Sequence, residues 1–356
     1  MIRSVRRWLP VLGVASVLAS TLALTGQGVA SADVPSTRTT VLLVPAGQAP
    51  ALPARAAVVP PRSAPVRTQD LTCHAGQDWE NRFEICRTIA LSAVVTVIDS
   101  KTGATTVIGV SNFLATHHIV MNPNSRTLGD NLTLTFTTGS GDIAGLSVVI
   151  IGADCGANCP GSVSWLPQPA TPGSVDSGTV AFSSLGIDTV ALRGTYNVVF
   201  PKPNAASPPG SWSGPSWRCD SAISIVGGCV NPSYIPTMTS MATLPNISAS
   251  IRAIQNNGPS HWGRPGSGRP LNRTSDAALA DRNYTAACGG RTSPSPSLSC
   301  DEYPFKTTYQ GASRTAFPDW GFAFVPITEQ SSQGGLISSF YQGQRLLDGD
   351  AFWVAV

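Results

Sequence analysis

Eight cysteines constrain the fold of this 356-residue chain more than any other feature. They occur in four close pairs along the sequence: Cys73 and Cys86, Cys155 and Cys159, Cys219 and Cys229, Cys288 and Cys300. An even number of cysteines in an exported chain is typical of disulfides, and pairing of neighbours is the simplest connectivity. Zinc is the alternative, but only Cys155 and Cys159 approach the spacing of a zinc-binding pair, and no second pair matches them. We therefore predict four disulfides.

The N-terminus indicates export. Three arginines within the first seven residues precede an apolar stretch over residues 8–24, and Ala30-Ser31-Ala32 follows as a small-residue cleavage site. This is the arrangement of a signal peptide, whereas a membrane helix needs a longer uncharged span. We predict that residues 1–32 are removed and that the protein is secreted without stable membrane association. The mature chain then has 20 basic and 20 acidic residues, so binding of a polyanion would require a local basic patch.

Low charge and frequent turn-forming residues favour β-structure. Charged residues make up only 12% of the chain, while glycine and proline together number 63. Residues 33–70 are rich in Pro and Ala, which predicts a flexible linker. Residues 71–200 predict a β-rich, sandwich-like domain, because short β-branched runs alternate with turn signals. The clearest signal is a hairpin, in which the turn Asp99–Gly103 separates two such runs. His117 and His118 lie there beside apolar residues, which predicts structural roles.

The pattern changes in the C-terminal half. Residues 201–257 are rich in Pro, Ser and Trp and predict an irregular connection that Cys219 and Cys229 would staple. Residues 258–356 predict a small α+β unit. Its expected elements are a helix over 275–287 with Thr274 or Ser275 as N-cap, a strand over 321–327, a helix over 331–344 and a strand over 351–356.

The most unusual stretch is Cys300-Asp301-Glu302-Tyr303-Pro304-Phe305, where two adjacent carboxylates follow a predicted disulfide. Carboxylates are natural ligands for Mg²⁺ or Mn²⁺, and hydrolysis of a phosphodiester requires a Lewis acid and an activated water. Chemistry alone nevertheless favours a solvated surface turn for such a pair.

Several motifs favour a functional role for this pair, because they occur in the same order in a known family. They are CDEYPF (300–305) with Thr308–Ala312, the approach His261-Trp-Gly with Pro270–Arg273, Asp281–Asn283 and Ala287-Cys288, and the ending Gln333–Leu336, Phe340-Tyr341 and Arg345–Asp350. Residues 258–356 resemble the secreted deoxyribonucleases of the NucA/NucB type, in particular their actinobacterial branch. Residues 71–257 resemble no family that we recognise.

The resemblance implies a small metal-dependent nuclease domain that cuts DNA with Mg²⁺ or Mn²⁺. Glu302 would then be a metal ligand or the general base, and Asp301 its neighbour in the catalytic metal site. Gln330 is expected as a further metal ligand, and Gln333 as a contact to the substrate.

Basic and imidazole side chains supply the other expected site residues. Arg273 and Arg282 are candidate phosphate clamps, because guanidinium binds phosphate through two parallel hydrogen bonds; a solvated or bridging role is the alternative. His261 is a candidate general base or phosphate contact, since its ordinary pKa suits neutral pH. Its alternative is a stacking partner for Trp262. Asn272 is expected to contact the substrate.

Two positions depart from the family pattern. Relatives often have an aspartate directly before the arginine that matches Arg273, where this chain has Asn272, which cannot take up a proton usefully. Asp276 is a possible substitute. The family pattern also has an Asp-Asn pair where this chain has Glu329-Gln330. Each of these two side chains is one methylene longer than its counterpart.

Three functions remain compatible with the sequence. The first is a secreted metal-dependent endodeoxyribonuclease, whose β-rich region presents the domain, binds the cell wall or covers the site. The second is an inactive extracellular binding or structural protein with a nuclease-like domain, which the two departures would favour. The third is an antibacterial DNase toxin, which would require an immunity partner.

Overall fold

The computed structural model describes residues 37–49, 72–185, 191–223 and 226–356. Residues 37–356 form one compact unit. The predicted signal peptide over 1–32 lies outside the described residues. In the described part of the chain, no helix has the length and apolar character needed to cross a bilayer. All four predicted disulfides are confirmed, each joining neighbouring cysteines.

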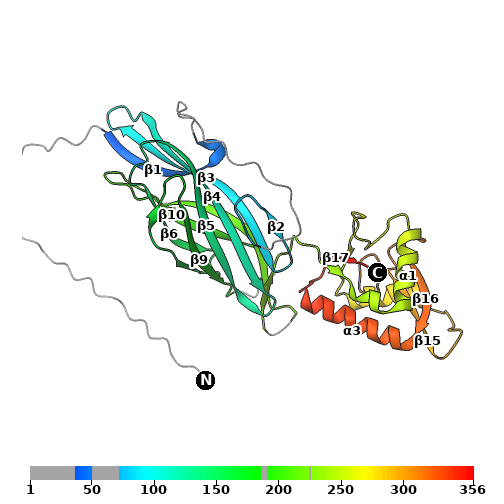
Figure 1. Cartoon of the computed structure of the whole chain (residues 1–356). Coiled ribbons are helices and arrows are strands. Elements are labelled where there is room, and N and C mark those ends of the chain that lie inside the picture. Colours follow the sequence, from blue (N-terminus) through cyan, green and yellow to red (C-terminus); the bar gives the residue numbers. More distant parts are fainter. Residues whose placement is uncertain (1–36, 50–71, 186–190, 224–225) are drawn as a thin grey trace, which may run out of the picture. The chain divides into compact units, whose positions relative to one another are not determined.

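Two antiparallel sheets build the β-rich region (Figure 1). The first has the order β1-β3-β4-β5-β9-β7, with β2 paired to β3. Its strands are β1 (Thr37–Pro45), β2 (Trp79–Glu80), β3 (Glu84–Asp99), β4 (Thr105–Asn122), β5 (Ser125–Gly141), β7 (Gly161–Ser164) and β9 (Val175–Ser183). The second has the order β12-β11-β10-β6-β8. Its strands are β6 (Ser147–Asp154), β8 (Gln168–Pro169), β10 (Ala191–Val199), β11 (Gly210–Asp220) and β12 (Gly228–Val230).

The predicted hairpin joins β3 to β4. The Asp99 carboxylate accepts hydrogen bonds from the backbone N–H groups of Lys101 and Thr102, and Gly103 has φ of 69°. Aspartate and glycine suit these positions, because one bonds the turn backbone and the other tolerates positive φ. The long strands β3, β4 and β5 then lie side by side (Figure 1).

The two sheets share one hydrophobic core. Alternate residues of β5 are buried, including Leu132, Leu134 and Phe136, as period-two patterning predicts. Tyr196 and Trp212 contribute from the second sheet. The sandwich-like arrangement predicted for this region therefore follows from two sheets that bury their facing sides.

The core also contains a buried polar cluster around His117. Its Nδ1 lies 2.7 Å from an Asp130 carboxylate oxygen, and Trp212 Nε1 donates to its Nε2 at 3.0 Å. Because an indole N–H can only donate, Nε2 must accept and Nδ1–H must donate to Asp130. Tyr196 donates to the same carboxylate oxygen. These closed contacts agree with the structural role predicted for this histidine.

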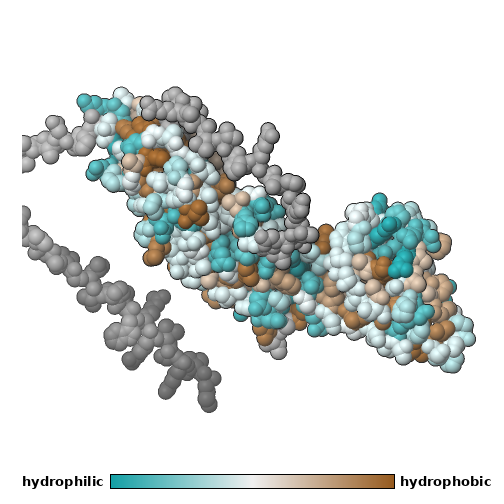
Figure 2. All heavy atoms as spheres, viewed as in Figure 1, coloured by the Kyte–Doolittle hydropathy of each residue, from teal (hydrophilic) through white to brown (hydrophobic). Residues whose placement is uncertain are grey.

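The C-terminal part has a separate core, in which Ile247, Leu271, Tyr303 and Phe352 are buried. Its strands pair as β13-β17-β14 and β15-β16. The elements are β13 (Thr237–Met238), α1 (Pro245–Asn257), β14 (Leu271–Asn272), α2 (Ala277–Cys288), β15 (Leu298–Tyr303), β16 (Gly321–Pro326), α3 (Ile327–Gly343) and β17 (Ala351–Val354). On the face shown in Figure 2, apolar and polar residues are interspersed.

Three expectations about local structure need correction. The predicted linker begins instead as strand β1, because Thr37–Val44 is rich in β-branched residues and precedes the prolines; residues 50–71 lie outside the described part. The expected irregular connection over 201–257 contains β11, β12, β13 and α1. The N-cap of α2 is Asp276, whose carboxylate accepts from the N–H groups of Ala278 and Leu279.

Candidate active site

Strand β15 carries the two acidic residues of the CDEYPF motif into the interior. Asp301 is 2% exposed and Glu302 is 7% exposed, so the motif is not the solvated turn that its charge alone suggests. β15 pairs with β16, and the Cys288–Cys300 disulfide ties its centre to the end of α2. The backbone that carries both carboxyls is therefore held on two sides.

Helix α3 faces the Asp301 carboxyl. Burial raises the pKa of Asp301 to about 7, although the neighbouring amides of Gln333 and Gln330 act in the opposite direction. Neither amide is fully satisfied there. Among the described residues, Gln330 Oε1 and Gln333 Nε2 are buried without a hydrogen-bond partner of normal geometry.

Glu302 lies beside Lys306 at the start of the following loop. Burial and the nearby Asp301 charge raise the pKa of Glu302 to about 7, while the backbone N–H and the charge of Lys306 oppose this rise. The Lys306 N–H donates to Glu302 Oε1 at 3.2 Å. No ion pair of either carboxyl occurs within the residues that the structure describes.

A cavity of about 420 Å³ opens at this point. Its lining includes Glu302, Lys306, Gln330, Gln333 and Tyr341. This volume lies within the range of about 300–1,000 Å³ that is typical of ligand pockets. One wall thus combines a carboxyl, an ammonium group and two amides, which is a suitable environment for a phosphodiester.

The donor set fits a hard divalent cation. Neither carboxyl forms an ion pair among the described residues, although the Lys306 charge acts on Glu302. Gln330 Oε1 is a further buried oxygen without a hydrogen-bond partner. Mg²⁺ is usually bound through one or two carboxylates and keeps several waters. In the described ranges no group of three or more His, Cys, Asp or Glu side chains is placed to hold a metal ion.

A second cavity of about 520 Å³ adjoins the first, because Ser338 and Tyr341 line both. Arg273 lines this second cavity, and its guanidinium lies 5.0 Å from the centroid of the Tyr341 ring. The same guanidinium donates to the Leu346 carbonyl. Arg273 is therefore fixed on the far side of Tyr341 from the acidic pair.

The C-terminal part of the chain matches a known protein family in sequence. Residues 263–355 match the family model of deoxyribonuclease NucA/NucB. No curated protein matches the chain. The matched segment contains both acidic residues, Lys306, the two glutamines of α3 and Arg273, which confirms the resemblance inferred from the motifs.

His261 lies just before the matched NucA/NucB segment and away from the cavity. Its Nδ1 is 2.6 Å from the carbonyl oxygen of Gln255 at the end of α1, and it does not line the cavity that contains Glu302. The structure therefore does not bring this candidate base to the acidic pair.

Arg282 and Asn272 also have other surroundings. The Arg282 side chain is 61% exposed on α2 and lies 3.9 Å from Asp276. The Asn272 side-chain amide donates to the Gly349 backbone carbonyl, and its Oδ1 accepts from the Gln310 side chain. Its amide thus joins three segments of the domain, so the change from aspartate affects a position that supports the fold. Asp276 caps α2, so it does not take the place of the aspartate that relatives have at position 272.

Glu329 has a structural role beside the metal-ligand candidate Gln330. Its carboxylate accepts from the backbone N–H groups of Asn246 and Ile247 and from the Asn246 side chain. Helix α1 has no side-chain cap of its own, so Glu329 satisfies its first amides from a neighbouring helix.

The sequence interpretation missed Lys306, although a signal was present. It is one of only three lysines in the chain and follows Glu302 by four residues. A cation this close to a motif with two acids is a natural partner for a phosphate.

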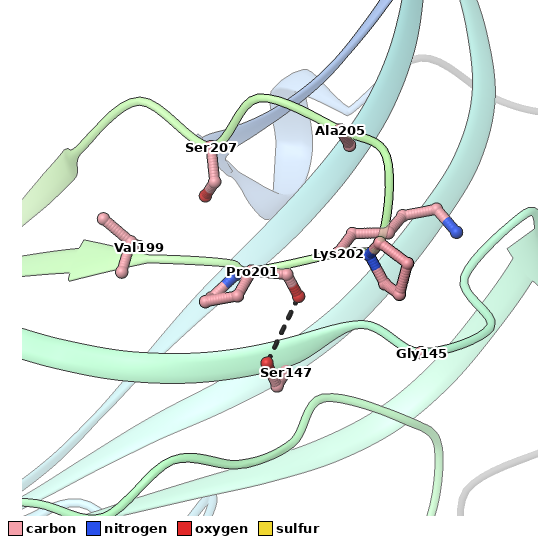
Figure 3. Close-up of a pocket in the computed structure, with 8 residues that line it drawn as sticks. Gly145, Ser147, Val199, Pro201, Lys202, Ala205 and Ser207 are labelled. Carbon is pink, nitrogen blue, oxygen red and sulfur yellow. Dashed lines mark hydrogen bonds between the residues drawn. The ribbon is translucent and has the colours of Figure 1, made fainter.

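A further cavity, of about 560 Å³, lies in the β-rich region (Figure 3). Its polar groups already have partners: Lys202 Nζ binds Asp142 and the Ala144 carbonyl, and Ser147 donates to the Pro201 carbonyl. No unpaired group there points to a ligand or to chemistry.

Proposed function

We propose that this protein is a secreted endodeoxyribonuclease that hydrolyses phosphodiester bonds of DNA with a divalent cation, Mg²⁺ or Mn²⁺. The observation that carries the proposal is the pair of buried carboxyls Asp301 and Glu302 within the NucA/NucB segment, of which Glu302 lines a cavity. The motif order supports the actinobacterial branch of that family.

Asp301 and Glu302 would hold the cation, with the Gln330 carbonyl as a further ligand. When bound, the cation would polarise the phosphate and make a water molecule more acidic. Burial supports this assignment, since a carboxyl kept from water gains strongly from a divalent partner.

The remaining side chains of the cavity suit the substrate. Glu302, which lines this cavity, accepts the proton of the attacking water. The Lys306 ammonium group stabilises the charge that develops on the phosphate oxygens. Arg273 binds a neighbouring phosphate, and Gln333 donates to the substrate from α3.

Export fits this assignment. Four disulfides persist only where the surroundings are oxidising, and the matched family suggests an extracellular protein. Extracellular DNA would be the substrate, and a cation in the medium would complete the site.

The decisive experiment incubates the purified mature protein with plasmid DNA and Mg²⁺ or Mn²⁺, with and without EDTA. Cleavage that EDTA stops, and that Glu302→Gln loses, is the expected result. Asp281→Asn is the matched control, because it makes the same carboxylate-to-amide change at an exposed position of α2. If the folded wild type cuts with neither metal, the proposal fails and the protein is a binding module.

A further inference from the structure

We propose that the β-rich region forms one wall of the DNA-binding groove, so that residues outside the nuclease segment contribute to substrate affinity. This inference rests on the proposed function and concerns the second cavity. The β-rich region contributes Ala222 and Ile223, which follow strand β11, and the nuclease segment contributes Arg273, Ser275 and Asp348.

The wall is firmly anchored. Asp220 is fully buried at the end of β11, accepts from the Ala222 backbone N–H at 3.2 Å and binds the Arg345 guanidinium. The Cys219–Cys229 disulfide joins β11 to β12 beneath it. Ala222 and Ile223 therefore begin from a fixed strand end, as a preformed binding surface requires.

Two arginines of the β-rich region hold the segment that follows α3. Arg218 makes two hydrogen bonds to the Asp350 carboxylate, both at 2.9 Å, and a third to the Arg345 carbonyl at 2.7 Å. Arg82 reaches the same carboxylate at 3.2 Å and the Gln344 carbonyl at 2.8 Å. Bidentate pairing of this kind fixes orientation as well as distance.

The same segment positions the phosphate-binding candidate. The Arg273 backbone N–H donates to the Asp350 carbonyl at 2.9 Å, and its guanidinium donates to the Leu346 carbonyl. The Asp348 carboxylate accepts from the Ser275 N–H at 2.8 Å. Contacts therefore run from the β-rich region through residues 344–350 to Arg273.

The chemistry of the second cavity fits nucleotides flanking the bond that is cut. It offers a guanidinium for phosphate, hydroxyls and an amide for sugar or base edges, and the apolar surface of Ile223 and Leu347. Because Ser338 and Tyr341 line both cavities, a strand bound at Glu302 can continue past Tyr341 into this space. The Asp348 carboxylate stays charged, because hydrogen bonds from Ser275 and Tyr309 and the nearby charge of Arg273 lower its pKa. A bound strand would therefore have to approach this space along the Arg273 side.

The test introduces opposite charges at one exposed wall position in the full mature chain. Ala222→Glu should raise the KM for a 20-nucleotide DNA roughly three- to fivefold, and Ala222→Lys should leave it unchanged or lower it. Neither should change the rate for bis(p-nitrophenyl) phosphate, which occupies only the cavity at Glu302. Val175→Glu and Val175→Lys are the matched controls, at a 64% exposed residue of the β-rich region.

The outcomes separate this inference from the proposed function. Equal KM values for both Ala222 variants, or equal shifts for the long and short substrates, would overturn it while leaving the nuclease assignment intact. If the wild type does not cut, the same variants are compared by fluorescence anisotropy with labelled DNA in EDTA. A charge-dependent Kd then supports the groove without catalysis, and identical Kd values reject it.

Discussion

The carboxyls of Asp301, Glu302 and Asp220 are buried and that of Asp350 is partly buried, but their surroundings differ. The first two have no arginine partner, and burial raises the pKa of each to about 7. Burial would also raise the pKa of Asp350, but the hydrogen bonds and charges of Arg218 and Arg82 lower it overall. The difference separates acids that pair with arginines inside the fold from the two acids to which the proposed function assigns a ligand.

The arginines show the converse effect. Burial lowers the pKa of Arg82 to about 10, although Asp350 opposes the change. Within this cluster each charge compensates the desolvation of another. Asp301 and Glu302 form no ion pair among the described residues, and strongly shifted pKa values of this kind are common at functional sites.

The largest expected effect is the loss of DNA cleavage when Asp301 or Glu302 is changed. Asp301→Asn and Glu302→Gln should each reduce DNA cleavage by about 10²–10⁴-fold, because each removes a ligand or proton acceptor at the site. Both variants should remain folded in EDTA, since an amide resembles the neutral carboxyl. Initial rates with saturating Mn²⁺ check this. A variant with wild-type rates would remove that carboxyl from the mechanism.

The next effect is on stability. Asp350→Asn should lower the free energy of unfolding by about 3–5 kcal/mol, because Arg82 and Arg218 would lose their shared carboxylate while remaining buried. Urea denaturation measures this. Glu80→Gln is the control, since its pair with Arg87 is exposed and should change stability by under about 1 kcal/mol. Equal losses in both variants would contradict the structural role of Asp350.

The two sets should also respond oppositely to pH. In EDTA the folded state retains protons on Asp301 and Glu302 up to about pH 7, whereas the ordinary pKa values of these side chains are 3.8 and 4.5. The unfolding free energy should therefore fall as pH rises from about 5 to 7, by at most about 1.4 kcal/mol per unit for each carboxyl. Asp350, with its lowered pKa, contributes stability that is lost only as the pH falls below its usual range.

The measurement is urea denaturation in EDTA across this pH interval, with Asp301→Asn as the comparison. The variant should show a flatter profile than the wild type. Adding Mg²⁺ should stabilise the wild type more at pH 8 than at pH 5, since the cation competes with protons. A wild-type profile that rises between pH 5 and 7 would contradict the raised pKa values.

The smallest effect concerns Glu329, which adjoins Gln330 but belongs to the structural set. Glu329→Gln should cost about 1 kcal/mol, because the charge at the first amides of α1 is lost while one acceptor remains. Cleavage rates should stay within about twofold of wild type at a temperature where both are folded. A loss as large as that of Glu302→Gln would place Glu329 in the metal site.

Local patterns predicted most of the elements. Alternation identified β5, turn chemistry identified the β3–β4 hairpin, and the cysteine spacing led to the four disulfides that the structure contains. The acidic motif and the glutamines of α3 were also found, because they fall in recognisable order along the chain. These features depend on residues that are close in sequence or on a motif, and both can be read from one sequence.

Only the tertiary structure decided which charges are buried and what they face. The sequence assigns Asp301 and Glu302 to one motif, but their raised pKa values come from burial in the folded domain. Likewise, nothing local links Arg82 to Asp350, 268 positions later. Desolvation and long-range pairing depend on distances in space. The sequence therefore determined the elements and the acidic motif, while folding determined which carboxyls are buried without an ion pair and which bind arginines.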